Sequence, residues 1–353
     1  MRRLIRRISS SSVSKHKQLD LHVPRNFKFM IIISIILLIA CMIASLSLGA
    51  RVVSFQELMD GLFNHNNESY GANVVRKRFS RTIFSLLCGA ALGVAGALMQ
   101  AVTRNPLADP SILGVNTGAA LFVVCGIAFL NISTANQYIW LALIGSELTA
   151  AFVFGIGSMG RGGATPIKLV LAGAATTAAL SSLVTTVMIP NSYAMDQFRF
   201  WQLGSVGSAT WSSIATFFPF LIIGILIALI TAPALNALAL GDDAATGLGV
   251  RPGFLRLGAA IGGVILCGAA TALAGPIGFI GLLSTHAMRL ILGPDLRFLI
   301  PMSAITGAII LTMSDVIGRL VASPGELEVG VVTAFIGAPI LIILAKKSKV
   351  RSL

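Results

Sequence analysis

The stretch FMIIISIILLIACMIASLSLG, at residues 29–49, decides what kind of fold this chain can form. It contains no charged residue, and about 20 apolar residues are enough to span the hydrocarbon core of a bilayer as a helix. Eight basic residues precede it, and a secretory signal peptide also begins with basic residues before an apolar stretch. The apolar run here is longer than the roughly 7–15 apolar residues of such a signal. We expect a first membrane span, retained in the mature protein, after a basic cytoplasmic tail at residues 1–28.

Comparable apolar runs recur along the rest of the chain. Hydrophobic residues make up 56% of it and charged residues 11%, against about 25% charged in soluble domains. The segment 190–211 is too polar and aromatic to span, and is expected as an interfacial helix or a partly re-entrant loop. The sequence predicts an all-α polytopic membrane protein with one transmembrane domain at 29–346, a short cytoplasmic tail at 347–353, and nine further spans at 80–102, 112–130, 138–158, 166–189, 212–233, 254–274, 277–292, 299–320 and 328–345.

The net charge of +13 belongs to the flanks of these spans rather than to a nucleic-acid surface. With the N-terminus inside, cytoplasmic segments hold 19 of the 26 Lys and Arg residues and external segments hold seven. This bias is typical of membrane proteins and predicts that both termini are cytoplasmic. Four of the seven external cations cluster at 76–81, against the bias, which suggests a specific use for them.

No pattern for catalysis or metal binding is present. No lysine follows a glycine, so a phosphate-binding Walker A loop cannot occur, and the chain has no Gly-x-Ser-x-Gly or His-Glu-x-x-His motif. The four cysteines each lie in an apolar run without CxxC spacing, and the four histidines lack metal-ligand spacing. We expect neither an enzyme nor a directly bound metal or cofactor, so any ATP that drives the protein is used by a separate subunit.

The longest internal cytoplasmic loop, residues 234–250, is mildly amphipathic. Leu235, Leu238, Ala239 and Leu248 are its apolar positions, and the Asp242-Asp243 pair is expected to be exposed. Gly241 predicts two short helices joined at that residue. Short apolar helices outside the bilayer need a surface to pack against, which is either a soluble partner or the protein's own membrane ends.

Four segments in order give the chain its resemblance to a known family. They are GALMQAVTRNPLADPSILGVNTGA (96–119), LNALALGDDAATGLGV (235–250), GPIGFIGLLSTHAMR (275–289) and a tail that includes GELEVGVVTAFIGAPI (325–340). With them the chain resembles the FecCD family, the permeases of type II ABC importers for iron-siderophores and cobalamin. The resemblance covers nearly everything from Arg78 to Lys346.

The resemblance implies a bacterial cytoplasmic-membrane subunit of about ten helices that imports ferric siderophore, with cobalamin or haem as the alternative solute. It also implies a second permease, identical or related, two ABC ATPase subunits and an extracytoplasmic binding protein or lipoprotein. A proton-coupled secondary transporter and a non-transporting scaffold are rival hypotheses.

Three sets of site residues follow from the resemblance. The docking set for the binding protein is Arg78, Arg81 and Arg319, although anchoring at lipid headgroups is an alternative for the first two. A cytoplasmic gate is expected at Thr165, Pro166 and Ile167. The segment that couples to the ATPase is expected at Leu238, Ala239, Leu240, Gly241, Asp242, Asp243, Ala245 and Gly247.

Two acids lie within apolar segments. Asp315 precedes Arg319 by four residues on one helix face, so a local ion pair is expected. Glu147 has no such partner, and its role is either a proton relay or a structural hydrogen bond to a neighbouring helix. His286 follows Thr285 where family members commonly have Pro-His, so the role of His286 stays open.

Overall fold

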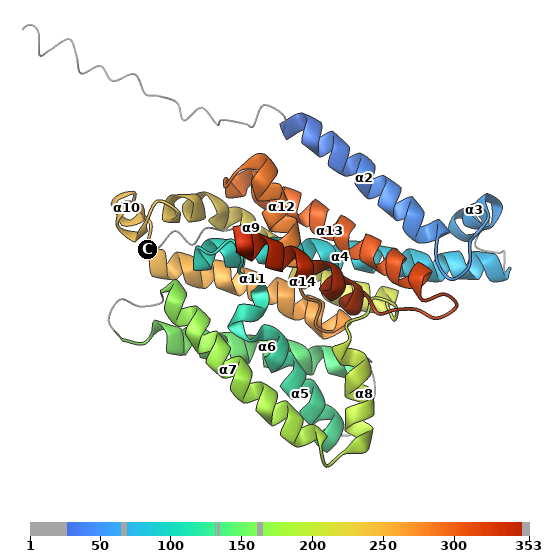
Figure 1. The fold of residues 1–353 in the computed structure, drawn as a ribbon, viewed down its shortest axis with the longest axis horizontal. Coiled ribbons are helices and arrows are strands. Elements are labelled where there is room, and N and C mark those ends of the chain that lie inside the picture. The colour runs from blue at the N-terminus through green and yellow to red at the C-terminus, as the bar shows by residue number, and fades with distance from the viewer. Residues whose placement is uncertain (1–26, 65–68, 131, 133–134, 161–164, 348–353) are drawn as a thin grey trace, which may run out of the picture.

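The computed structural model describes residues 27–347 except 65–68, 131, 133–134 and 161–164, and that part of the chain is helical without strands (Figure 1). The tails predicted at 1–28 and 347–353 lie almost wholly outside the described residues. Seven of the described helices are long and apolar enough to cross a membrane. They are α2 (Phe27–Ser47), α4 (Tyr70–Thr103), α6 (Ala135–Ser158), α7 (Pro166–Met188), α9 (Trp211–Leu238), α11 (Pro252–Ala274) and α13 (Leu296–Val321).

Three shorter apolar helices complete the set of ten predicted spans. They are α5 (Val115–Leu130), α12 (Ile280–Leu292) and α14 (Val329–Lys347). The 3-10 turn η1 (Pro110–Leu113) precedes α5, and Gly114, with φ 73°, separates the two. The segment 190–211, expected as an interfacial helix or a re-entrant loop, contains the short helix α8 (Ser192–Gln202).

Helix α4 is longer than the predicted span, since it begins ten residues earlier. Its 34 residues extend about 51 Å, whereas a hydrocarbon core is about 30 Å thick. The excess turns of α4 pack against α3 (Phe55–Phe63), a helix that we did not predict. This contact lies at the end of the molecule away from α10 (Asp242–Gly247) (Figure 1). Ser54 and Glu57 form a reciprocal capping box at its start, and this Ser-x-x-Glu spacing was the overlooked sequence signal.

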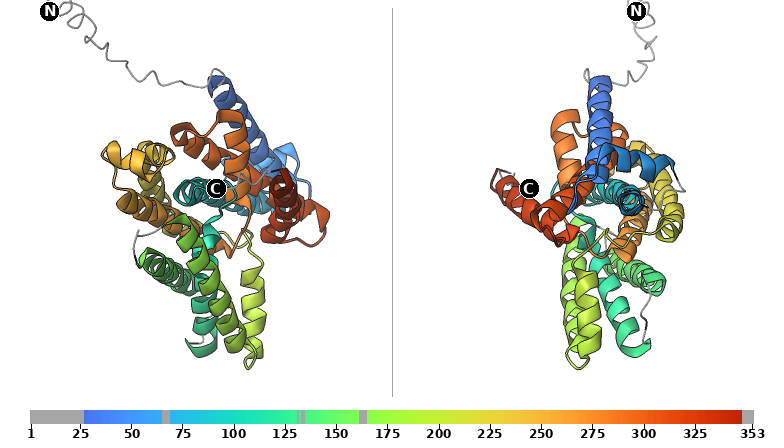
Figure 2. Two further views of the ribbon diagram at one scale, coloured as in Figure 1. Left: turned by 60° about the vertical axis from the view of Figure 1, so that its left-hand side comes forward. Right: turned by 90° about the vertical axis from the view of Figure 1, so that its right-hand side faces the viewer.

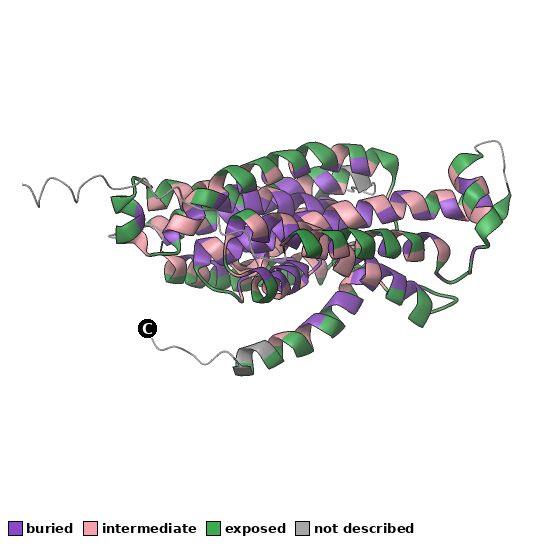
Figure 3. Cartoon of the chain, turned by 90° about the horizontal axis from the view of Figure 1, so that it is seen from above, coloured by how far each residue is buried: buried purple, intermediate pink, exposed green. Residues whose placement is uncertain are grey.

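The core forms where α11, α12 and α13 pack around α4. Figure 3 shows the buried residues gathered in the middle of the helix bundle. Glycines allow backbones to touch there: a Cβ on Gly89 would strike the carbonyl oxygen of Gly307, and one on Gly96 would strike that of Gly281. Small residues at helix contacts are a general feature of membrane bundles. Helices α5, α6, α7 and α8 form a second group beside this bundle (Figure 2).

Gly307→Ala is expected to destabilise the subunit by about 1–3 kcal/mol, because its new methyl group would overlap the α4 backbone at Gly89. Thermal unfolding in detergent, followed by size-exclusion fluorescence, measures the effect. Gly258→Ala on α11 is the matched control, since a Cβ there meets nothing within 4 Å. The control should be neutral or stabilising by up to about 1 kcal/mol. Equal behaviour of the two variants would contradict the close α4–α13 contact.

Candidate functional site

The predicted coupling loop lies beyond the end of α9, at the end of the molecule opposite α3 (Figure 1). The expectation of two short helices joined at Gly241 is wrong in one respect: the first is the last turn of α9, which continues unbroken to Leu238. Gly241, with φ 115°, turns the chain into α10 (Asp242–Gly247). A left-handed φ of this kind favours glycine because it has no Cβ.

Burial divides the apolar residues of this loop into two groups. Leu235, Leu238 and Ala245 are at most 2% exposed and fix the loop to the rest of the chain. Leu240 and Leu248 are 70% and 65% exposed and point away from the core. Of the two surfaces that the sequence left open for Leu235 and Leu238, the structure shows the protein's own chain, and the free apolar surface belongs to Leu240 and Leu248.

Asp242 is held by two arginines that sequence reasoning missed. Its Oδ1 accepts a hydrogen bond of 2.8 Å from Arg256 Nη2 on α11 and another from Arg104 at the end of α4. Arg104 also donates to the Leu238 carbonyl oxygen at 2.6 Å. Partial burial acts to raise the pKa of Asp242, but the bonds and charges of the two arginines outweigh it and hold the pKa below its usual value. Asp242 thus ties α10 to α4 and α11, while Asp243 stays exposed.

Arg78 and Arg319, predicted to dock a binding protein, are buried instead. Their exposed fractions are 9% and 2%. Arg78 donates to the carbonyl oxygens of Leu46, Ser47 and Arg51 at 2.7–3.2 Å. Arg319 donates to the carbonyl oxygens of Ser45 and Leu48 at 3.0–3.1 Å. The last carbonyls of a helix lack partners within it, so both arginines cap the end of α2 rather than present their charge outward.

Arg81 occupies a different position at the rim of this cluster. Its guanidinium group binds Asp315 through two nitrogens, at 2.7–3.2 Å, and Glu326 at 2.6 Å. Asp315 also pairs with Arg319 at 3.1 Å, which confirms the predicted local ion pair. The Glu326 side chain is 46% exposed, so Arg81 bridges a buried acid and a surface acid.

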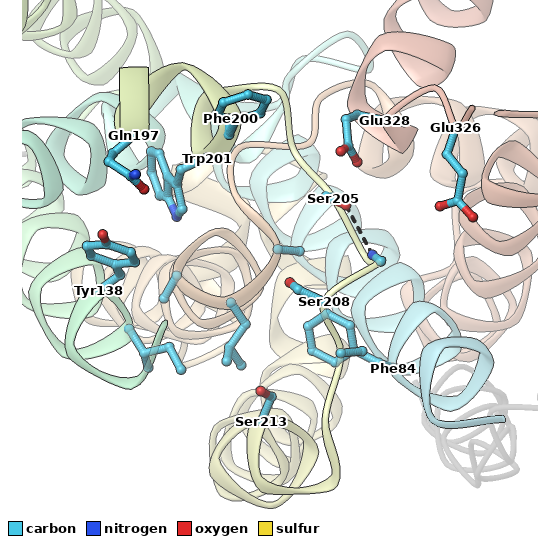
Figure 4. Close-up of a pocket in the computed structure, with 16 residues that line it drawn as sticks. Phe84, Tyr138, Gln197, Phe200, Trp201, Ser205, Ser208, Ser213, Glu326 and Glu328 are labelled. Atoms are coloured by element: carbon cyan, nitrogen blue, oxygen red, sulfur yellow. Dashed lines mark hydrogen bonds between the residues drawn. The ribbon is translucent and has the colours of Figure 1, made fainter. Parts of the chain in front are cut away.

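A recess of about 530 Å³ is lined in part by Glu326, the surface partner of Arg81 (Figure 4). Glu326 and Glu328 lie on one side of it, and Tyr138, Gln197 and Trp201 lie on the other. Among the described residues no group accepts a hydrogen bond from the buried Trp201 Nε1. The lining combines aromatic faces with polar and acidic groups, which suits passing contact with a polar solute.

The remaining predicted residues lie apart from these clusters. Thr165 caps α7, Pro166 is its first residue, and Ile167 is exposed beside them. The gate was predicted at the start of the fifth span, and these three residues lie at that helix start. His286 is partly buried on α12, and its Nδ1 has no partner among the described residues. No group of three or more His, Cys, Asp or Glu residues suited to a metal ion occurs within the described ranges.

Comparisons with known proteins identify the family to which this chain is similar. The model of the FecCD transport family matches residues 37–347. The Fe(3+)-citrate import system permease protein YfmD of Bacillus subtilis is 40% identical over 91% of this chain and 95% of its own length. The ferric enterobactin transport system permease protein FepD of Escherichia coli is 40% identical over 89% and 93%.

A solved structure of a metal-chelate type ABC transporter in an inward-facing conformation has the same fold. It superposes with a TM-score of 0.78 at 25% identity, over 91% of this chain and 99% of that one. The family, the fold and the apolar helices agree on an integral membrane transport subunit rather than an enzyme. This chain belongs to the FecCD transport family of ABC importer permeases.

Proposed function

We propose that the chain is the permease subunit of an ATP-driven importer that carries a ferric siderophore across the bacterial cytoplasmic membrane. The observation that carries the proposal is the family match over 37–347, together with relatives at 40% identity whose names specify ferric citrate and ferric enterobactin. These substrates favour an iron chelate over cobalamin or haem.

The proposed assembly contains a second permease, identical or related, two ABC ATPase subunits and an extracytoplasmic binding protein or lipoprotein. The permease itself binds no cofactor, and the partner subunits use the ATP. Both termini are proposed to be cytoplasmic, supported by the excess of Lys and Arg in the segments on that side.

The inner loop, defined as residues 238–248, is the proposed contact with the ATPase. Leu240 and Leu248 offer exposed apolar side chains to a partner cleft. Movement of α10 passes to α4 through Arg104 and to α11 through Arg256, because both arginines hold Asp242. These two helices also form much of the core, so a push at the loop is transmitted into the bundle.

The gate is proposed at Thr165, Pro166 and Ile167, where α7 begins. Proline at the first helical position fixes the backbone without losing a helix hydrogen bond. The start of α7 is therefore fixed at the residues proposed for the gate.

Docking of the binding protein is proposed to use Arg81 from the original three arginines, because Arg78 and Arg319 cap α2. Arg81→Gln is expected to weaken docking of the cognate binding protein at least tenfold, because Arg81 lies at the rim of the cluster, where a carboxylate of the binding protein can replace its exposed partner Glu326. Titration against nanodisc-embedded importer measures this. Lys77→Gln, an exposed neighbour on the same helix, is the control and should change the affinity less than threefold. Unchanged docking of a folded Arg81→Gln importer would exclude the role.

Reconstitution tests the function as a whole. Proteoliposomes that contain the permease, the ATPase and the binding protein should accumulate radioactive iron from a ferric siderophore only when ATP is enclosed with the ATPase. The permease alone should not accumulate iron under a pH gradient. Gradient-driven uptake without ATP would support a secondary transporter, and no uptake with all partners present would support a scaffold. Parallel assays with cobalamin and haem identify the solute.

A further inference from the structure

Glu147 stands near the middle of α6, about 17 Å from either end at 1.5 Å per residue. Its neighbours Ile144 and Leu148 on the same helix are 48% and 55% exposed, so this face of α6 looks out of the subunit. In a chain that spans a bilayer, such a face meets the hydrocarbon of lipid rather than water.

A crevice of about 140 Å³ lies between α6 and α11 beside this residue. Its apolar lining includes Phe154 from α6, Leu113 from η1, and Leu257, Ile261 and Val264 from α11. Glu147 is the one charged residue in that lining.

The carboxyl group lacks a hydrogen bond and an ion pair from any described residue. The structural bond to a neighbouring helix that the sequence suggested is therefore not present among them. An ionised carboxylate without partners is strongly disfavoured in an apolar setting, whereas the neutral acid is tolerated.

Within the described residues, the helices that line the crevice carry one cation, Arg256 on α11, and its guanidinium group is bound to Asp242 at 2.8 Å. Cys267 on α11 interacts electrostatically with both Glu147 and Asp109, the residue that caps η1, and neither Cys267 nor Asp109 can carry a positive charge. Helix α5 carries only Cys125 as a titratable residue, and α7 carries only Lys168, which donates to the Met159 carbonyl oxygen at the inner end.

We propose that Glu147 is a proton-binding site that carries its proton at neutral pH and opens to the lipid phase through the α6–α11 crevice. A protonated acid in this setting reacts selectively with a hydrophobic carbodiimide. Its proton passes to one reagent nitrogen and its oxygen bonds to the central carbon. The acyl group then migrates to nitrogen, giving a stable N-acylurea with no leaving group.

The test uses the full-length protein in lipid nanodiscs, treated at neutral pH with dicyclohexylcarbodiimide or with a water-soluble carbodiimide, followed by peptide mass spectrometry. We expect the hydrophobic reagent to label Glu147 at least tenfold more than the soluble one does. Glu326, which faces solvent, serves as the internal control and should not show this preference. Labelling of Glu147 should fall as the pH is raised through the range in which its proton is lost.

Infrared difference spectra between wild type and Glu147→Gln give a second measurement that does not depend on reagent access. We expect a carbonyl stretch of a protonated acid at neutral pH that the variant lacks. An ionised carboxylate band in its place, or absence of hydrophobic labelling at Glu147, would overturn the proposal. Neither outcome bears on ATP-driven uptake, so this inference and the proposed function fail independently.

Discussion

Asp315→Asn is expected to destabilise the subunit by about 3–5 kcal/mol, the cost of breaking a buried ion pair from one side. Asp315 is 1% exposed and binds both Arg81 and Arg319. The neutral amide would leave Arg319 buried without a counter-charge, and would leave Arg81 with its surface partner Glu326 alone. Because Arg319 holds the end of α2, we expect that helix to loosen first.

Thermal unfolding in nanodiscs measures this loss, and hydrogen exchange at residues 45–51 locates it. Glu326→Gln is the matched control, because it removes a carboxylate from Arg81 at a site that is 46% exposed. Exposed pairs contribute about 0–1 kcal/mol, so the control should remain within that range. If both variants unfold together, the buried cluster does not stabilise the end of the molecule at which α2 ends.

Removal of the apolar contacts of the inner loop is expected to abolish co-purification of the ATPase. Deletion of residues 238–247 should have this effect, but it also removes the buried Leu238 and the Asp242 bonds. The sharper variant is Leu240→Ala with Leu248→Ala, which leaves those contacts in place. Central apolar anchors commonly contribute more than about 1 kcal/mol each, so we expect the ATPase affinity to fall at least tenfold.

Met159→Ala is the matched control for this variant. Met159 is 71% exposed after the end of α6, outside the loop, and its replacement should leave the affinity within threefold. Pull-down with purified ATPase and a titration by fluorescence anisotropy give the comparison. Retention of full affinity by the double alanine variant would mean that the ATPase binds elsewhere.

The membrane spans were predictable because each depends on the composition of one continuous segment. The Asp315–Arg319 pair was predictable for a similar reason, since four residues on a helix form a neighbouring pair whatever the rest of the chain does. Helix α4 was predicted too short because its first ten residues include three consecutive cations at 76–78, and they are helical through packing against α3.

Apart from this local pair, the partners of the arginines were not predictable, because they are set by tertiary contacts. Arg81 and Asp315 are 234 positions apart, and Arg104 and Asp242 are 138 apart. The resemblance suggested outward-facing arginines, and nothing in the sequence reveals that the carbonyls at the end of α2 lie within reach of Arg78 and Arg319. The same limit applies to Leu238 and Leu240, which differ in burial although they are two positions apart.

The capping of α2 by distant arginines sets an order for biosynthesis. Ribosomes release the N-terminal part of a chain first, so α2 enters the bilayer long before its partners exist. Arg78 follows Leu46 by 32 positions, but Arg319 follows Ser45 by 274. The Ser45 carbonyl oxygen therefore lacks its hydrogen bond from Arg319 until almost the whole polypeptide has been translated. A nascent chain that stalls before α13 therefore lacks the Arg319 hydrogen bonds that complete the end of α2.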